Sequence, residues 1–105
     1  MRIVEIQGIG MELTDAIRDF ATEKIMNLER FAKRFDPCEV AIALGKTSDR
    51  HQKGDVWFAE VTMNIPGDII RGHVETDDLY SAIDELKDDI QRQLVDKKEK
   101  MISAR

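Results

Sequence analysis

Residues 13–35 read LTDAIRDFATEKIMNLERFAKRF, and their apolar residues recur at helical spacing. Thr14 suits the N-cap of a helix, and Asp15 places a carboxylate in the first turn, where the helix dipole favours negative charge. The pair Asp36-Pro37 ends the pattern. We therefore expect an amphipathic helix of about five turns. Its apolar face carries Leu13, Ile17, Phe20, Ala21, Leu28, Phe31, Ala32 and Phe35.

Strand patterns lie on both sides of this helix. Residues 2–7 are a short β-branched stretch before it, and residues 39–44 alternate with period two after it. Residues 56–64 alternate in the same way and should bury one face. The turn at 65–69 contains a Pro-Gly pair and predicts a hairpin with a fourth strand at 70–74.

A second helix follows the last strand. Thr76, Asp77 and Asp78 offer a threonine or Asx cap with acids at the helix start, and the periodic pattern continues to about residue 100. The predicted apolar stripe consists of Leu79, Ile83, Leu86, Ile90, Leu94 and Met101.

The elements follow the order β-α-β-β-β-α, so we expect residues 1–105 to form a single domain of the α+β class. The helix between the first two strands predicts a right-handed parallel crossover, and the short later connections predict antiparallel strands. The result is a two-layer sandwich in which two parallel helices cover one face of a four-stranded sheet.

Composition limits the function classes. The 16 Lys and Arg against 21 Asp and Glu give a net charge of -5, which by itself argues against a nucleic-acid binder. A single cysteine, Cys38, excludes an internal disulfide, and a packed thiol is its expected state. The chain has no signal-peptide core and no apolar run of membrane-spanning length, so we predict a cytoplasmic protein without membrane contact.

Residues for catalysis are missing from the sequence pattern. His51 and His73 have no spacing that would hold a metal, and His73 should be a strand residue on the solvated side. The segment Gly8-Ile9-Gly10 lacks the third glycine of a dinucleotide fingerprint. We predict a protein that is not an enzyme and that uses no cofactor, no metal and no small-molecule substrate.

The predicted topology separates the charges. Because the two helices are parallel, their C-terminal ends meet at one end of the domain, and basic residues gather there while acids lie at the opposite end. The same pattern also follows from the helix dipole in any solvated helix, so it does not decide function alone. The basic residues in question are Lys24, Arg30, Lys33, Arg34, Arg92, Lys97, Lys98, Lys100 and Arg105.

Two other features have both a structural and a nucleic-acid interpretation. Trp57 shares a strand face with Val61 and Met63, which favours core packing over a base-stacking platform on the open face. The basic loop with Lys46, Arg50, His51 and Lys53 is either a second phosphate contact or a polar loop.

The segment from Asp77 to Leu86, DDLYSAIDEL, followed by IQRQL at 90–94 and a lysine-rich tail, resembles the second helix of the ribosome hibernation-promoting factors, also called ribosome-associated inhibitors. The stretch at 13–18, continuing to Leu28, resembles their first helix. The resemblance covers nearly the whole chain. The chain ends near residue 105, and in this it resembles the short forms that lack a C-terminal dimerisation domain.

The resemblance implies a stress-response factor of stationary phase that lies between the ribosomal subunits. Such a factor would bind rRNA of the small subunit in the cleft for tRNA and mRNA and sterically block translation. Five basic residues match the family pattern: Arg18, Lys24, Arg92, Lys98 and Lys100. Geometry adds Arg30, Lys33, Arg34 and Lys97 to the predicted RNA-binding set.

The chain also departs from the family pattern. Asn27, Asp89 and Asp96 stand where relatives often carry lysine, and each lost phosphate contact would weaken RNA binding. Two alternatives remain open: a protein-interaction module that pairs through its sheet edge, and a free double-stranded-RNA-binding domain.

Overall fold

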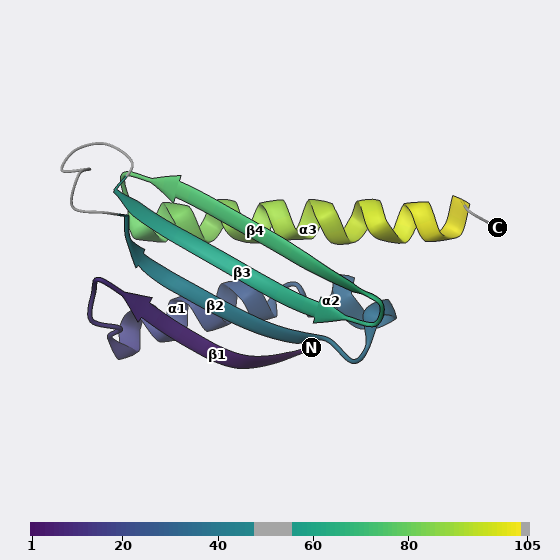
Figure 1. Ribbon diagram of the computed structural model, residues 1–105, viewed down its shortest axis with the longest axis horizontal. Helices are drawn as coiled ribbons and strands as arrows, with labels where there is room; N and C mark the ends of the chain where they lie inside the picture. The colour runs from purple at the N-terminus through teal and green to yellow at the C-terminus, as the bar shows by residue number, and fades with distance from the viewer. Residues whose placement is uncertain (48–55, 104–105) are drawn as a thin grey trace.

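The computed structural model describes residues 1–47 and 56–103 and contains one four-stranded sheet covered on one face by helices (Figure 1). The predicted α+β sandwich is confirmed. In chain order the elements are β1 (Arg2–Ile9), α1 (Asp15–Met26), α2 (Glu29–Ala32), the 3-10 helix η1 (Lys33–Phe35), β2 (Glu39–Lys46), β3 (Trp57–Ile65), β4 (Asp68–Thr76) and α3 (Leu79–Ser103).

The sheet has the order β1-β2-β3-β4. β1 is parallel to β2 and the later pairs are antiparallel, as the sequence predicts. The hairpin between β3 and β4 is tight, because Ile65 pairs with Asp68 and only two residues lie between them. Gly67 has φ 78°, which the second central residue of a type II turn requires and which only glycine adopts without strain.

The core lies between the sheet and the helices. Side chains alternate along β2 so that Val40, Ile42 and Leu44 are buried, and they meet buried residues of α1 and α3 such as Ile25 and Leu86. α3 approaches β4 closely at Gly72, where an added Cβ would lie 2.8 Å from the Cδ1 atom of Ile90. Glycine at this position therefore sets how near the long helix can lie to the sheet.

The predicted five-turn helix at 13–35 is wrong in one respect: it is not continuous. Thr14 caps α1 as expected, accepting a hydrogen bond from the backbone N–H of Ile17 at 3.2 Å. Around Asn27 the chain tightens, and the backbone N–H of Leu28 bonds to the carbonyl of Ile25, three residues earlier. The apolar spacing survives this break because Leu28, Ala32 and Phe35 all remain buried.

α3 begins as predicted and ends differently. The Asp78 carboxylate accepts the backbone N–H of Ser81 at 3.0 Å, which is the Asx cap expected from the sequence. The apolar stripe is buried as far as Leu94, but Met101 is 46% exposed, so its predicted place in the core is wrong. Figure 1 shows the reason: the C-terminal part of α3 extends beyond the end of the sheet. Within the described part of the chain, no helix has the length and apolar character needed to cross a bilayer.

Candidate nucleic-acid interface

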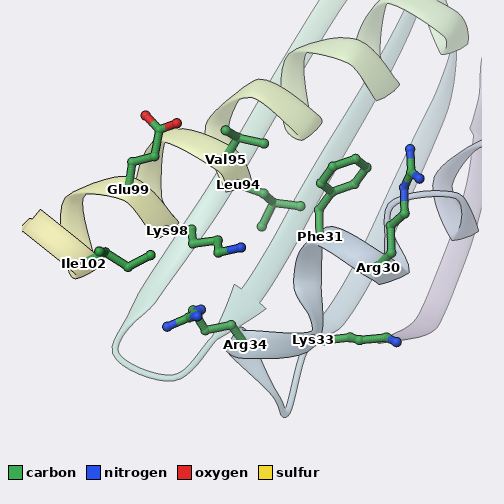
Figure 2. Close-up of a pocket in the computed structure, with 9 residues that line it drawn as sticks. All are labelled: Arg30, Phe31, Lys33, Arg34, Leu94, Val95, Lys98, Glu99 and Ile102. Atoms are coloured by element: carbon green, nitrogen blue, oxygen red, sulfur yellow. The ribbon is translucent and has the colours of Figure 1, made fainter.

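A groove of about 540 Å³ lies where the C-terminal ends of the two helical segments meet (Figure 2). One wall comes from α2 and η1 and the other from the last turns of α3. The two walls come together because α1 and α3 run in the same direction over the sheet (Figure 1). The predicted juxtaposition of helix C-termini is therefore present in the structure.

Four of the predicted RNA-binding residues line this groove: Arg30, Lys33, Arg34 and Lys98. All four are exposed, and none of them forms an ion pair with another side chain that the structure describes. Among the described residues, no carboxylate lies within ion-pair distance of these four cations, so their charges remain available to a ligand. A surface of this kind attracts phosphate groups even in a protein whose net charge is negative.

The groove also has an apolar floor, which the sequence pattern does not mark as part of any site. Phe31, Leu94, Val95 and Ile102 contribute to it. The Arg30 guanidinium lies 4.6 Å from the centroid of the Phe31 ring, a cation–π contact. Val95 and Ile102 lie next to the predicted apolar stripe of α3, and their spacing in the sequence does not mark them as part of a site. They line the groove because they follow the point at which the sheet ends.

Three other predicted residues are engaged within the protein. The Nζ atom of Lys24 lies 3.1 Å from Oδ1 of Asp84, an ion pair that joins α1 to α3. Arg92 pairs with Asp89 one helical turn earlier, and Lys97 pairs with Asp68 at the start of β4. Each of these three cations already pairs with a carboxylate of the protein. An RNA phosphate would have to compete with that carboxylate for the cation.

Asp68 shows the effect of such pairing on titration. The pKa of its carboxyl is lowered, mainly by the hydrogen bond from Lys97 and then by the backbone N–H of Ile69, which donates at 2.8 Å. Lys97 and Lys100 share a shallow depression with Asp68 on the β4 side of α3, away from the residues of the main groove.

Arg18 lies apart from both groups. It is exposed in the first half of α1, whereas the groove begins at Arg30. The structure thus brings together four of the nine predicted residues, places Lys97 and Lys100 on a neighbouring side, and leaves Arg18, Lys24 and Arg92 outside these clusters.

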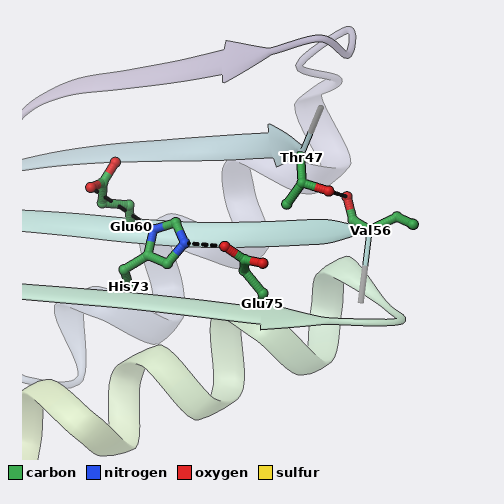
Figure 3. A network of polar contacts seen from close by, with 5 residues as sticks. All are labelled: Thr47, Val56, Glu60, His73 and Glu75. Carbon is green, nitrogen blue, oxygen red and sulfur yellow. Dashed lines mark hydrogen bonds and ion pairs between the residues drawn. The ribbon is translucent and has the colours of Figure 1, made fainter. Parts of the chain in front are cut away.

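The opposite face of the sheet carries a different polar network (Figure 3). On β4, His73 Nε2 lies 2.8 Å from Oε2 of Glu75, and its Nδ1 lies 3.9 Å from Oε1 of Glu60 on β3. The His73 ring stacks on Phe58 with centroids 5.6 Å apart. His73 is a half-exposed strand residue as expected, and the described residues contain no cluster of metal-ligating side chains.

The tryptophan belongs to the helix-covered side. Trp57 packs against the core, and the Lys46 Nζ atom lies 5.1 Å from its ring centroid. This favours the core-packing interpretation of Trp57 over a stacking platform on the open face. Of the basic loop, Lys46 is described, while Arg50, His51 and Lys53 lie outside the described residues.

Cys38 is buried beside the start of β2, as predicted for a packed thiol. Burial raises the pKa of this thiol, and the nearby N-terminal amino group opposes the shift only in part. A thiol in this state is a poor nucleophile.

Comparison with known proteins connects this arrangement to a family. "Ribosome hibernation promoting factor" of Azotobacter vinelandii is 35% identical over 99 residues, covering 94% of this chain and 85% of the relative. "Ribosome hibernation promotion factor" of Deinococcus radiodurans is 31% identical over 94 residues, and the chain spans only 48% of that longer relative. The solved Protein Y N-terminal domain of Thermus thermophilus aligns with a TM-score of 0.71 and 32% identity, covering 90% of this chain and 96% of that structure.

A family model described as "Sigma 54 modulation protein / S30EA ribosomal protein" matches residues 4–102. The match extends from β1 to the penultimate described residue of α3, so it includes both walls of the groove. The chain therefore belongs to the Sigma 54 modulation protein / S30EA ribosomal protein family, and the resemblance to ribosome hibernation-promoting factors is confirmed.

Proposed function

We propose that this chain binds rRNA of the small ribosomal subunit through the groove at the C-terminal ends of its helices and sterically blocks translation. Membership of the family and the names of the relatives support a ribosome-associated role in hibernation. The groove as the site, rRNA as the ligand and steric blocking as the manner of inhibition are our additions. A cytoplasmic location follows from a ribosomal partner.

One observation carries the proposal: Arg30, Lys33, Arg34 and Lys98 lie around a single groove without internal ion pairs among the described residues. Phosphate binding needs concentrated, unneutralised positive charge more than a positive total. The remaining cations of the predicted set, namely Arg18, Lys24, Arg92, Lys97 and Lys100, would contribute secondary contacts. No bond is made or broken in this function, so the protein acts by occupying space.

The first test is co-sedimentation of the purified protein with ribosomes through sucrose at increasing salt. Four phosphate contacts predict that the binding constant falls with salt with a logarithmic slope of about -3. Migration with the small subunit or the whole ribosome, lost as salt rises, is the expected result. A protein that stays at the top of the gradient at low salt contradicts the proposal.

Charge reversal then tests the site. The double substitution Arg34→Glu and Lys98→Glu should abolish most binding, because both residues line the groove from opposite walls. The double substitution Arg2→Glu and Arg71→Glu is the matched control, since it reverses two charges at exposed strand residues outside the main groove. Equal loss in both variants would mean that net charge rather than the groove determines binding.

The two alternatives make different predictions. A protein-interaction module that adds a strand at the β1 edge would be insensitive to the groove variants, and the register shift between Ile3 and Glu5 makes that edge irregular. A free double-stranded-RNA binder would be expected to present basic residues at a helix start, whereas α3 follows Asp77 and Asp78. Competition by free duplex RNA distinguishes the second alternative.

A further inference from the structure

The groove combines a cationic surface with an apolar surface. A site that binds phosphate alone would need only the cations. The cations of the groove surround a floor of Phe31, Leu94, Val95 and Ile102. Ile102 is 49% exposed on the last turns of α3, beyond Leu94, the last buried residue of that helix. A ligand that covers this floor must be partly apolar and must carry negative charge at its edge.

We infer that the groove accepts one unpaired nucleotide of the bound RNA, with its base against Phe31 and a phosphate on Arg34 and Lys98. This inference rests on the proposed function and names the ligand group that the groove recognises. A nucleobase offers an apolar face for stacking, and its phosphate lies within one nucleotide of that face. The groove volume of about 540 Å³ falls in the range of sites that hold small molecules.

The position of Arg30 supports stacking in the groove. Its guanidinium covers one side of the Phe31 ring, and Figure 2 shows the Phe31 side chain of α2 beside the Leu94 side chain of α3. A base that enters beside Leu94 would meet the ring and remain within the field of the guanidinium. Aromatic rings and arginine planes are the groups on which unpaired bases stack in RNA-binding proteins.

Charge complementarity favours an anionic occupant of the groove. Glu99 is the one acid among the nine lining residues, and in Figure 2 its carboxylate points away from Arg34 and from the amino group of Lys98. An acidic peptide would satisfy the same cations. An extended peptide would also need backbone hydrogen-bond partners, and helical walls use their own backbone groups internally.

The test compares two labelled RNA pentanucleotides by fluorescence anisotropy at low salt with the full chain. One carries five bases, and the other has the same number of phosphates but an abasic central position. We expect the abasic RNA to bind about tenfold more weakly, which corresponds to the loss of one stacked base. Phe31→Leu should remove this preference while leaving the charge-dependent part of binding.

Tyr80→Leu is the matched control because Tyr80 is also a half-exposed aromatic residue on the helical layer. Its ring packs edge-on against Phe20, with centroids 4.8 Å apart, and it does not line the groove. The control variant should retain the tenfold preference. The comparison between the two RNAs on the unaltered protein needs no substitution, so it stands even if Phe31→Leu lowers stability.

Several outcomes overturn the inference and leave the proposed function separately testable. Equal affinity for both pentanucleotides would mean that the groove reads phosphate alone, and ribosome co-sedimentation would be unaffected. Equal competition by a duplex of the same length, or no binding of the base-containing RNA, would exclude an inserted base. Displacement by an acidic aromatic peptide with the same dependence on Phe31 would identify the occupant as a peptide.

Discussion

The Nζ atom of Lys97 lies 2.5 Å from the Oδ2 atom of Asp68, and this ion pair attaches the last part of α3 to the first residue of β4. It joins residues 29 apart in sequence. The contact fixes the side of α3 that faces the hairpin, while the opposite side of the same helix turns toward the groove. The pair thus helps set the direction in which Lys98 presents its charge.

The Asp68 pair predicts a pH-dependent contribution to stability. The pKa of Asp68 is lower in the folded chain, so the carboxylate stabilises the fold above its unfolded pKa of about 3.9. This contribution is lost as the pH falls through the folded pKa. Asp68→Asn should therefore lower Tm at pH 7, and the difference from the unaltered protein should shrink below about pH 4. Thermal unfolding followed by circular dichroism from pH 2.5 to 7 measures it, with Glu12→Gln as the control at an exposed acid.

Substitution of Asp89 should strengthen ribosome binding. Its carboxylate holds Arg92 and also accepts a hydrogen bond from the Gln93 side chain at 3.0 Å. Asp89→Asn should free Arg92 for a phosphate, tighten ribosome binding several-fold, and steepen the logarithmic salt slope by about 0.7–0.9. Salt-dependent co-sedimentation measures both. Asp19→Asn changes the net charge equally in the first half of α1, so an equal gain in both variants would contradict the local explanation.

A side chain added at Gly72 should overpack the contact between β4 and α3. A Cβ there would lie 2.8 Å from Cδ1 of Ile90 and 2.9 Å from Cδ1 of Leu86, so Gly72→Ala should reduce the free energy of unfolding by about 1–3 kcal/mol. Ile90→Val alone should cost about 0.5–1.5 kcal/mol. Because Ile90→Val removes one clashing methyl group, the double variant should cost less than the sum. Urea denaturation of all four proteins measures this, and strict additivity would show that the clash is relieved elsewhere.

Two methionines provide a matched test of where the core ends. Met63 of β3 is fully buried, and Met63→Ala should cost about 2–5 kcal/mol of unfolding free energy. Met101→Ala should cost less than about 0.5 kcal/mol, because Met101 lies on the part of α3 that extends past the sheet. Chemical denaturation distinguishes them. Similar losses would mean that the end of α3 is packed in solution.

The fold could be predicted because the apolar residues recur at strand spacing in each strand and at helical spacing in each helix. Val40, Ile42 and Leu44 specify the buried face of β2, and Thr14 and Asp78 mark helix starts. The break at Asn27 could not be predicted, because the apolar spacing continues through it without change. The exposure of Met101 depends on how long α3 is relative to the sheet. The periodicity of apolar residues along one helix gives no information about that relation.

The site was predicted only as a region. Parallel helices bring their C-terminal ends together, so the gathering of Arg34 and Lys98 follows from topology. Which cations remain unpaired depends on side-chain partners far apart in sequence, such as Lys97 with Asp68 and Lys24 with Asp84. The apolar floor was missed because Phe31 carries a core-like spacing and gives no separate signal.

The extension of α3 beyond the sheet has a consequence for hydrogen exchange and binding entropy. The last buried residue of this helix is Leu94, so the segment from Val95 to Ser103 depends on helical hydrogen bonds with little core packing. Its amides should open locally and exchange faster than those between Leu79 and Leu94, which need larger unfolding. The wall of the groove that carries Lys98 is thus the least stable part of the helix. A ligand that covers it must restrain this segment, so part of the interaction energy goes into ordering the helix end.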